Sequence, residues 1–210
     1  VSDGMALYRL GATGVWERLP FVAGSGPAAS RPTAGFNRML YSLAPSGSIL
    51  RYRADAQGLT SETWAAVEQY PDLAQARDIA IDERIHVLLA DGTIETFREG
   101  LLESLSSPPV IPASSSGGFF AANGGSPVLY MVDPATTVGG AAGRVIRYVP
   151  GGEAQQFVAP NPGSLGGEAA LAAAAIGSAR QAAVVESLGQ VFILSGDDLW
   201  VANIPAGPLI

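Results

Sequence analysis

Apolar and polar positions alternate along this chain in a unit that occurs five times. Each unit has an apolar run, a turn containing Gly or Asp, and a second run that alternates in polarity and ends near an aromatic residue. This pattern is typical of a β-hairpin. The predicted strand pairs are 6–10 with 15–19, 39–43 with 49–52, 85–89 with 93–97, 128–132 with 144–148, and 190–194 with 199–202.

Further apolar runs lie on either side of these hairpins. They are candidate innermost strands at 78–82, 118–121 and 183–186, and candidate outermost strands at 63–67, 101–105 and 155–158. Equivalent positions at residues 8, 41, 87, 130 and 192 are 33, 46, 43 and 62 residues apart. A period near 40 with four strands per repeat is typical of propeller blades. We therefore predict an all-β fold, a β-propeller of four-stranded antiparallel blades that forms a single domain over residues 1–210.

The sequence is compatible with more than one number of blades and more than one way of closing the ring. Five hairpins favour five blades, while six blades and a fragment of a longer propeller remain open. The first hairpin lacks an innermost strand and the last lacks an outermost strand, so the terminal strands could share one blade. A β-sandwich also has short strands and frequent turns. The long regular period favours the propeller over the sandwich.

The segments between the repeats are predicted from their composition. Ser, Gly and Pro predict loops at 24–33, 106–118 and 159–167. The Gly-rich run 139–143 lacks the Gly-Lys-Ser/Thr ending of a phosphate-binding loop and is interpreted as a long hairpin turn. The Ala-rich run 168–175 is expected to form one or two helical turns.

Composition narrows the possible functions. The 210 residues are 48% hydrophobic and 15% charged, with a mean hydropathy of +0.25, which indicates a folded core rather than disorder. A net charge of −7 argues against nucleic acid as a partner. Every apolar stretch is too short to cross a bilayer, so no membrane contact is expected within this segment. The start at Val1, without Met or a leader pattern, is expected of a mature product or an excised domain.

Several chemically active residue types are missing. The chain has no Cys, a single His, and only Arg among its twelve basic residues. Disulfides and cysteine-ligated zinc are thereby excluded, and no metal or other cofactor is predicted. No catalytic motif of the Gly-x-Ser-x-Gly type is present either.

Three residues are candidates for a site on the channel face. Asp78 and Asp82, with Glu83 beside them, flank an innermost strand, where carboxylates could bind a cation or a polar ligand, although they more often satisfy turn amides. His86 occupies a repeat position that we align with residues 7, 40, 129 and 191, all Leu or Val. It is therefore interpreted as a partly buried repeat residue, with a general base or ligand role as the alternative.

The aromatic residues offer a second kind of site. Exposed Trp side chains could stack on carbohydrate. Trp16 and Trp200 fall within the repeat pattern, so they are expected in the core, which leaves Trp64 as the freer candidate.

Residues 36–205 resemble the extracytoplasmic C-terminal β-propellers of bacterial, Chloroflexi-type phosphatase-like membrane proteins. The segments 36–41, 78–82, 85–93 and 191–200 carry the resemblance, and they are shared loosely with NHL-type and lyase-type propellers. The resemblance implies a non-catalytic module outside the membrane, at the cell surface, with the phosphatase and any membrane anchor elsewhere in the polypeptide. It supplies no site residues.

Two functions follow as hypotheses. The first is an extracytoplasmic binding module, a sensor or interaction domain, whose partner is an unknown protein or a small polar ligand. The alternative is a propeller enzyme of the lyase or glycoside-hydrolase type with its site in the central channel. A purely structural spacer is a third possibility.

Overall fold

The structure is a computed structural model, and it describes residues 6–10, 14–22, 26–27, 33–37, 39–107, 119–121, 128–133, 144–150, 154–158, 179–195 and 197–203. These residues form five antiparallel sheets and two short 3-10 helices. Within each sheet the strands pair in the order in which they occur along the chain. The all-β prediction is therefore confirmed.

The sheets follow one another in sequence. The first pairs β1 (Ala6–Leu10) with β2 (Trp16–Pro20). The second contains β3 (Thr33–Phe36), β4 (Met39–Leu43), β5 (Ile49–Ala54) and β6 (Leu59–Ala65). The third contains β7 (Ala76–Ile81), β8 (Ile85–Leu89), β9 (Ile94–Arg98) and β10 (Leu101–Ser106).

The remaining elements complete the chain. The fourth sheet contains β11 (Phe119–Ala121), β12 (Leu129–Asp133), β13 (Arg144–Tyr148) and β14 (Ala154–Val158). The fifth contains β15 (Ala179–Val185), β16 (Gln190–Ser195) and β17 (Asp198–Asn203). The 3-10 helix η1 (Pro71–Gln75) precedes β7, and η2 (Glu186–Leu188) lies between β15 and β16.

All five predicted hairpins are confirmed, as are the six flanking strands to within a few residues. One strand was missed, because β3 begins at Thr33, at the end of the predicted loop 24–33. Its sequence, Thr-Ala-Gly-Phe, is short and contains Ala and Gly, which are weak strand formers. The runs 139–143, 159–167 and 168–175 lie outside the described residues, as do residues 108–118 of the predicted loop 106–118, whose first residue, Ser106, ends β10.

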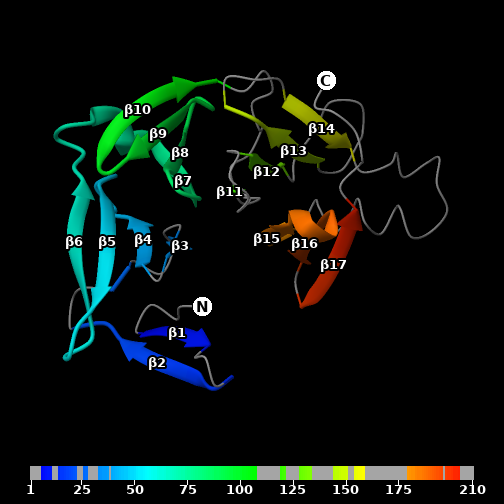
Figure 1. Cartoon of the computed structure of the whole chain (residues 1–210). Helices are drawn as coiled ribbons and strands as arrows, with labels where there is room; N and C mark the ends of the chain where they lie inside the picture. Colours follow the sequence, from blue (N-terminus) through cyan, green and yellow to red (C-terminus); the bar gives the residue numbers. More distant parts are fainter. Residues whose placement is uncertain are drawn as a thin grey trace.

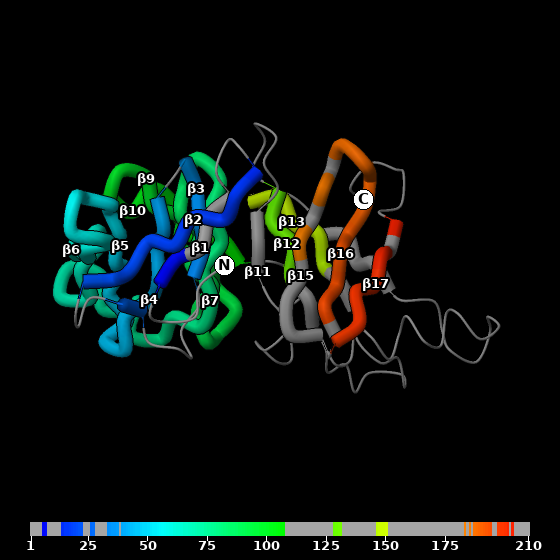
Figure 2. The backbone as a smooth tube through the Cα atoms, turned by 90° about the horizontal axis from the view of Figure 1, so that it is seen from below, coloured from blue at the N-terminus to red at the C-terminus, as the bar shows by residue number. Residues whose placement is uncertain are grey.

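The sheets are arranged side by side around a common centre (Figure 1). Their first strands lie nearest that centre, where β3 contacts β7, β7 contacts β11, and β11 contacts β15. In the view turned by 90°, β3–β10 gather on one side of the molecule and β12, β13 and β15–β17 on the other (Figure 2). The outermost strands are β6, β10 and β14, so each four-stranded sheet runs outward from the centre.

The core is divided among the interfaces between successive sheets. Leu40 and Tyr52 of the second sheet pack with Leu7 and Leu19 of the first. A larger cluster joins the second and third sheets, and a further one joins the third and fourth. Most central strands are therefore apolar on both faces, as expected for strands that are covered on both sides.

Tight turns with Asp and Gly close the hairpins. The Asp91 carboxylate accepts the amide of Thr93 at 2.8 Å, and the amide of Gly92 donates to the carbonyl of Leu89. Asp55 in the β5–β6 turn accepts the amides of Gln57 and Gly58. The sequence signal for these turns is local, which explains why their positions were predictable.

No helix in the part of the chain that the structure describes is long and apolar enough to cross a membrane.

Candidate functional site

Two of the three predicted site residues lie together. His86 on β8 is completely buried, and its Nδ1 lies 3.1 Å from the hydroxyl of Thr96 on β9. Its Nε2 lies 3.4 Å from Oδ1 of Asp82, which follows β7. The third residue, Asp78, uses its carboxylate to accept the amide of Ile79 at 2.8 Å.

The register places His86 in the interface between the third and fourth sheets. His86 is paired with Ala80 on β7, and Leu88 lies two residues further along its own strand. Ala80 and Leu88 pack against Leu129 of the fourth sheet. Cross-strand partners and residues two apart share a face, so His86 lies on that face too and not on the wall of an open channel.

This position corrects the alignment of His86 with Leu40 and Leu129. Leu40 packs against the first sheet and Leu129 against the third, so both face the preceding sheet, whereas His86 faces the following one. A shift of one residue moves a side chain to the opposite face of a strand. His86 is nevertheless buried, and more completely than the partly buried position that the sequence predicted.

Asp82 has the local role expected of a turn carboxylate. Burial raises its pKa, but the adjacent imidazole of His86, the hydrogen bond from the backbone amide of Arg84 and the guanidinium of Arg84 outweigh burial, and the pKa is lowered overall. The amide of Arg84 donates to Oδ1 at 2.6 Å. Asp82, which follows β7, thus contacts His86 on β8, and His86 contacts Thr96 on β9. All three side chains are buried, so a substrate does not reach them in this conformation.

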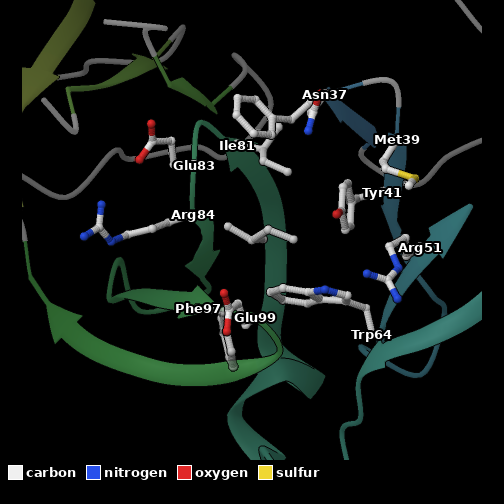
Figure 3. A pocket seen from close by; sticks show the side chains of 12 residues that line it. Asn37, Met39, Tyr41, Arg51, Trp64, Ile81, Glu83, Arg84, Phe97 and Glu99 are labelled. Carbon is white, nitrogen blue, oxygen red and sulfur yellow. The ribbon is translucent and has the colours of Figure 1, made fainter. Parts of the chain in front are cut away.

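A recess of about 430 Å³ lies elsewhere, between the second and third sheets (Figure 3). Side chains from both sheets line it, so its shape depends on how the two sheets pack. The lining residues are Phe36, Asn37, Met39, Tyr41, Arg51, Trp64, Ile81, Glu83, Arg84, Ile85, Phe97 and Glu99.

Four of the twelve lining residues are aromatic, and two of them, Tyr41 and Phe97, are buried in the core cluster between the two sheets. Tyr41 and Trp64 meet edge to face with centroids 5.8 Å apart, and Trp64 meets Phe97 at 6.4 Å. Tyr70 then contacts Phe97 at 5.1 Å. Such edge contacts fix the orientation of each ring, so the aromatic wall is preformed.

The charged lining residues differ in their pairing. Arg51 pairs with Glu62 of β6, and Arg84 pairs with Glu103 of β10. Within the described residues, no hydrogen bond or ion pair holds the carboxylates of Glu83 and Glu99. In Figure 3, Glu83 and Arg84 lie on one side of the recess, and Tyr41 and Arg51 on the other.

Two hairpin turns border the recess in an unusual backbone conformation. Asn37, between β3 and β4, has φ +47°, and Glu99, between β9 and β10, has φ +53°. Among the described residues these are the only non-glycine positions with positive φ. Asn adopts this region readily, whereas Glu does so at a cost, and such strain often gathers at functional sites.

Of this recess, sequence reasoning identified only Trp64 and Glu83, the latter as an acidic residue beside an innermost strand. Trp200 is half-buried, but Trp16 is 60% exposed, so its predicted place in the core is wrong. The Glu99-Gly100 pair at a two-residue turn was the available signal, because positive φ there favours Asn or Gly and a Glu is unexpected. Side chains of β4 and β8 meet in the recess only because the second and third sheets pack together. Local sequence patterns do not predict which sheets pack together, so they could not predict this recess.

One further buried carboxylate was missed. Glu95 on β9 is 2% exposed, and its Oε2 has no hydrogen-bond partner among the described residues. Burial raises its pKa, and the negative charges of Asp72 and Asp91 raise it further. Within the described residues, no three acidic or His side chains gather in a way that could hold a metal ion.

Comparison with known proteins gives a distant likeness among the solved structures. No protein-family model matches the chain, and no curated protein matches it. Among solved structures the chain is similar to PorZ, described as an essential bacterial surface component of the type-IX secretion system of Porphyromonas gingivalis. The identity is 16% and the TM-score 0.43, over 99% of this chain and 24% of PorZ. The chain spans about a quarter of PorZ, and at this TM-score the likeness carries no argument.

Proposed function

We propose that this chain is a five-bladed β-propeller acting as a non-catalytic binding module, with its ligand site in the recess between the second and third sheets. The observation that carries the proposal is the preformed aromatic wall with unpaired carboxylates beside it. Pockets that combine aromatic surface with a few polar groups are the usual form of ligand sites.

The propeller part of the proposal rests on topology. Each four-stranded sheet runs outward from the centre in strand order, and the first strands of neighbouring sheets contact one another. Radial repetition of such sheets is the propeller architecture. Apolar side chains at the two ends of the arc, such as Trp16 and Leu199, would be covered if the ring closed.

The location outside the cytoplasm and the likeness to phosphatase-like membrane proteins stay predictions. So does the alternative, an enzyme with its site in the central channel. His86 does not favour that alternative, because the chain's single imidazole is fully buried. A general base has to come within hydrogen-bond reach of its substrate.

The test is a ligand screen read by NMR. The indole N–H resonances of Trp16, Trp64 and Trp200 are assigned from Trp→Phe variants and followed while amino-acid amides, monosaccharides and nucleotides are added singly. The proposal expects at least one compound to shift the Trp64 resonance in a saturable way. Trp16, exposed on the first hairpin, is the internal control.

Two outcomes would contradict the proposal. If no compound moves Trp64, or if Trp16 and Trp200 move equally, the recess is not the binding site. If a bound compound is chemically converted during the experiment, the non-catalytic part of the proposal is wrong.

A further inference from the structure

We infer that the recess binds a cationic group, namely the guanidinium or ammonium of a basic side chain presented by a partner peptide. This inference rests on the proposed function, because it names the ligand chemistry of the same site.

The first support is the aromatic wall. Tyr41 and Trp64, held edge to face at 5.8 Å, come from the second sheet, and Phe36 lines the recess from the same sheet. Aromatic faces attract cations through the ring quadrupole, and Trp is the strongest of the three ring types. A basic side chain also has an apolar stem that can pack on such rings.

The second support is that both recess arginines already have partners. Arg51 donates from Nε to Glu62 Oε1 at 2.6 Å, and the pairing lowers the pKa of Glu62. Arg84 pairs through Nε with Glu103. An anionic ligand would have to compete with these carboxylates for the guanidinium groups.

Two further arginines share these carboxylates from outside the recess. Arg53 lies 2.8 Å from Glu62, and Arg98 lies 3.9 Å from Glu103. Both side chains are more than half exposed, at 53% and 60%. Each outer carboxylate therefore faces two guanidinium groups, and Glu83 and Glu99 bring the glutamates around the recess to four, equal in number to the four arginines.

The third support is the pair of carboxylates left over. Glu83 and Glu99 line the recess as exposed side chains, and neither carboxylate makes an ion pair or hydrogen bond among the described residues, although the charge of Glu83 helps to raise the pKa of Arg84. Glu99 is held at φ +53° by the tight β9–β10 turn. The negative charge available to a ligand therefore lies beside aromatic surface, which is the combination that recognises a cation.

The experiment measures affinity for a cation and its neutral isostere. N-acetyl-arginine amide and N-acetyl-citrulline amide are titrated separately into the 15N-labelled full chain, with the Trp64 indole resonance as the readout. N-acetyl-lysine amide, N-acetyl-glutamate amide and glucose are titrated in the same way. We expect the arginine amide to bind at least about tenfold more tightly than the citrulline amide, and binding to weaken with salt.

Matched variants assign the effect to the two carboxylates. Glu83→Gln with Glu99→Gln should weaken arginine-amide binding about tenfold, because both unpaired charges are lost. Glu17→Gln with Glu68→Gln removes the same net charge at exposed positions outside the recess and should leave the affinity unchanged. Thermal unfolding of each variant checks that it is folded.

The possible results separate the inference from the proposed function. If citrulline amide or glucose binds Trp64 as tightly as arginine amide, the site exists but the inference is overturned. Tighter binding of the glutamate amide also overturns it. If none of these probes moves Trp64 while another compound from the wider screen does, the inference is wrong and the proposed function stands. If nothing in either experiment moves Trp64, both are wrong.

Discussion

At the scale of single residues, Glu99 lines the recess and has a backbone conformation that is unfavourable for Glu. Its φ of +53° is followed by φ +85° at Gly100, the backbone of a two-residue turn that favours Asn-Gly. We expect Glu99→Asn to stabilise the fold by about 0.5–1 kcal/mol, because Asn tolerates this region better than Glu. Urea unfolding measures the change in the free energy of unfolding.

Glu83→Asn is the control for that prediction. It removes a recess carboxylate too, but Glu83 does not have positive φ, so no stabilisation is expected. An equal gain in both variants would mean that charge repulsion, rather than backbone strain, sets the cost of Glu99.

Glu95 makes the fold sensitive to pH. Its folded-state pKa is raised by burial, and Asp72 and Asp91 are the charged groups that add to the shift. Below the ordinary pKa, near 4.5, the carboxyl is protonated in the folded and unfolded chain alike. Above pH 4.5 the carboxyl ionises in the unfolded chain before it ionises in the folded chain, because burial disfavours its charge. The free energy of unfolding therefore falls as the pH rises from 4.5 to the raised pKa.

Glu95→Met should therefore gain stability over the natural chain as the pH rises from 4 to 7. Met has a similar volume and carries no charge that has to be buried. Urea unfolding at several pH values measures the gap, and Glu68→Met, at an exposed site, should show a constant difference. A Glu95→Met gap that does not change with pH would contradict this account.

At the scale of elements, the β9–β10 turn is held against neighbouring segments. The hydroxyl of Tyr70 donates to the carbonyl of Gly100 at 3.3 Å, and the amide of Leu102 donates to the same hydroxyl at 3.4 Å. A Cβ at Gly100 would lie 2.9 Å from the carbonyl oxygen of Trp64. The turn that presents Glu99 is therefore fixed to the strand that carries Trp64.

Gly100→Ala is expected to cost more than strain alone. Gly189 also has positive φ, at +62°, but a Cβ there meets nothing within 4 Å. Gly189→Ala should thus cost about 1 kcal/mol, and Gly100→Ala more, because backbone atoms must shift as well. Urea unfolding compares the two variants. Equal losses of stability would contradict the prediction, because they would show that the backbone near Trp64 moves aside without a measurable cost.

The hairpins could be predicted from the sequence, whereas most of the recess could not, because the recess depends on contacts between sheets. Hairpins are local, since turn residues and alternation lie within a dozen positions, and all five were predictable. The face that a repeat residue presents was not, because a one-residue error in aligning His86 with Leu40 reverses the face. The recess depends on contacts such as Trp64 with Phe97, made between sheets. Trp64 and Glu83 alone were identified in advance, Trp64 as an aromatic residue outside the hairpin pattern and Glu83 as an acidic residue beside an innermost strand.

At the scale of the whole molecule, the open question is whether the five sheets close into a ring. The first three interfaces between successive sheets each bury an apolar cluster, but the ends of the arc leave Trp16 60% and Leu199 65% exposed. Burying apolar surface is favourable, at roughly 25 cal/mol per Å². If the first and fifth sheets packed against each other, the ring would close and these side chains would be covered by residues already in the chain. This is why we propose a propeller rather than an open arc.

Distance measurement by electron paramagnetic resonance tests closure directly. The chain has no Cys, so Trp16→Cys with Leu199→Cys attaches two spin labels at unique sites. Packed sheets are about 10 Å apart, so a closed ring should place the labels within about 20–25 Å once their linkers are included. Ser61→Cys with Leu101→Cys, at exposed positions on the outermost strands β6 and β10, calibrates the distance for neighbouring sheets. A label separation across the ends that is much longer than this control, in a monomer, would show that the five sheets form an open arc, and the propeller proposal would fail.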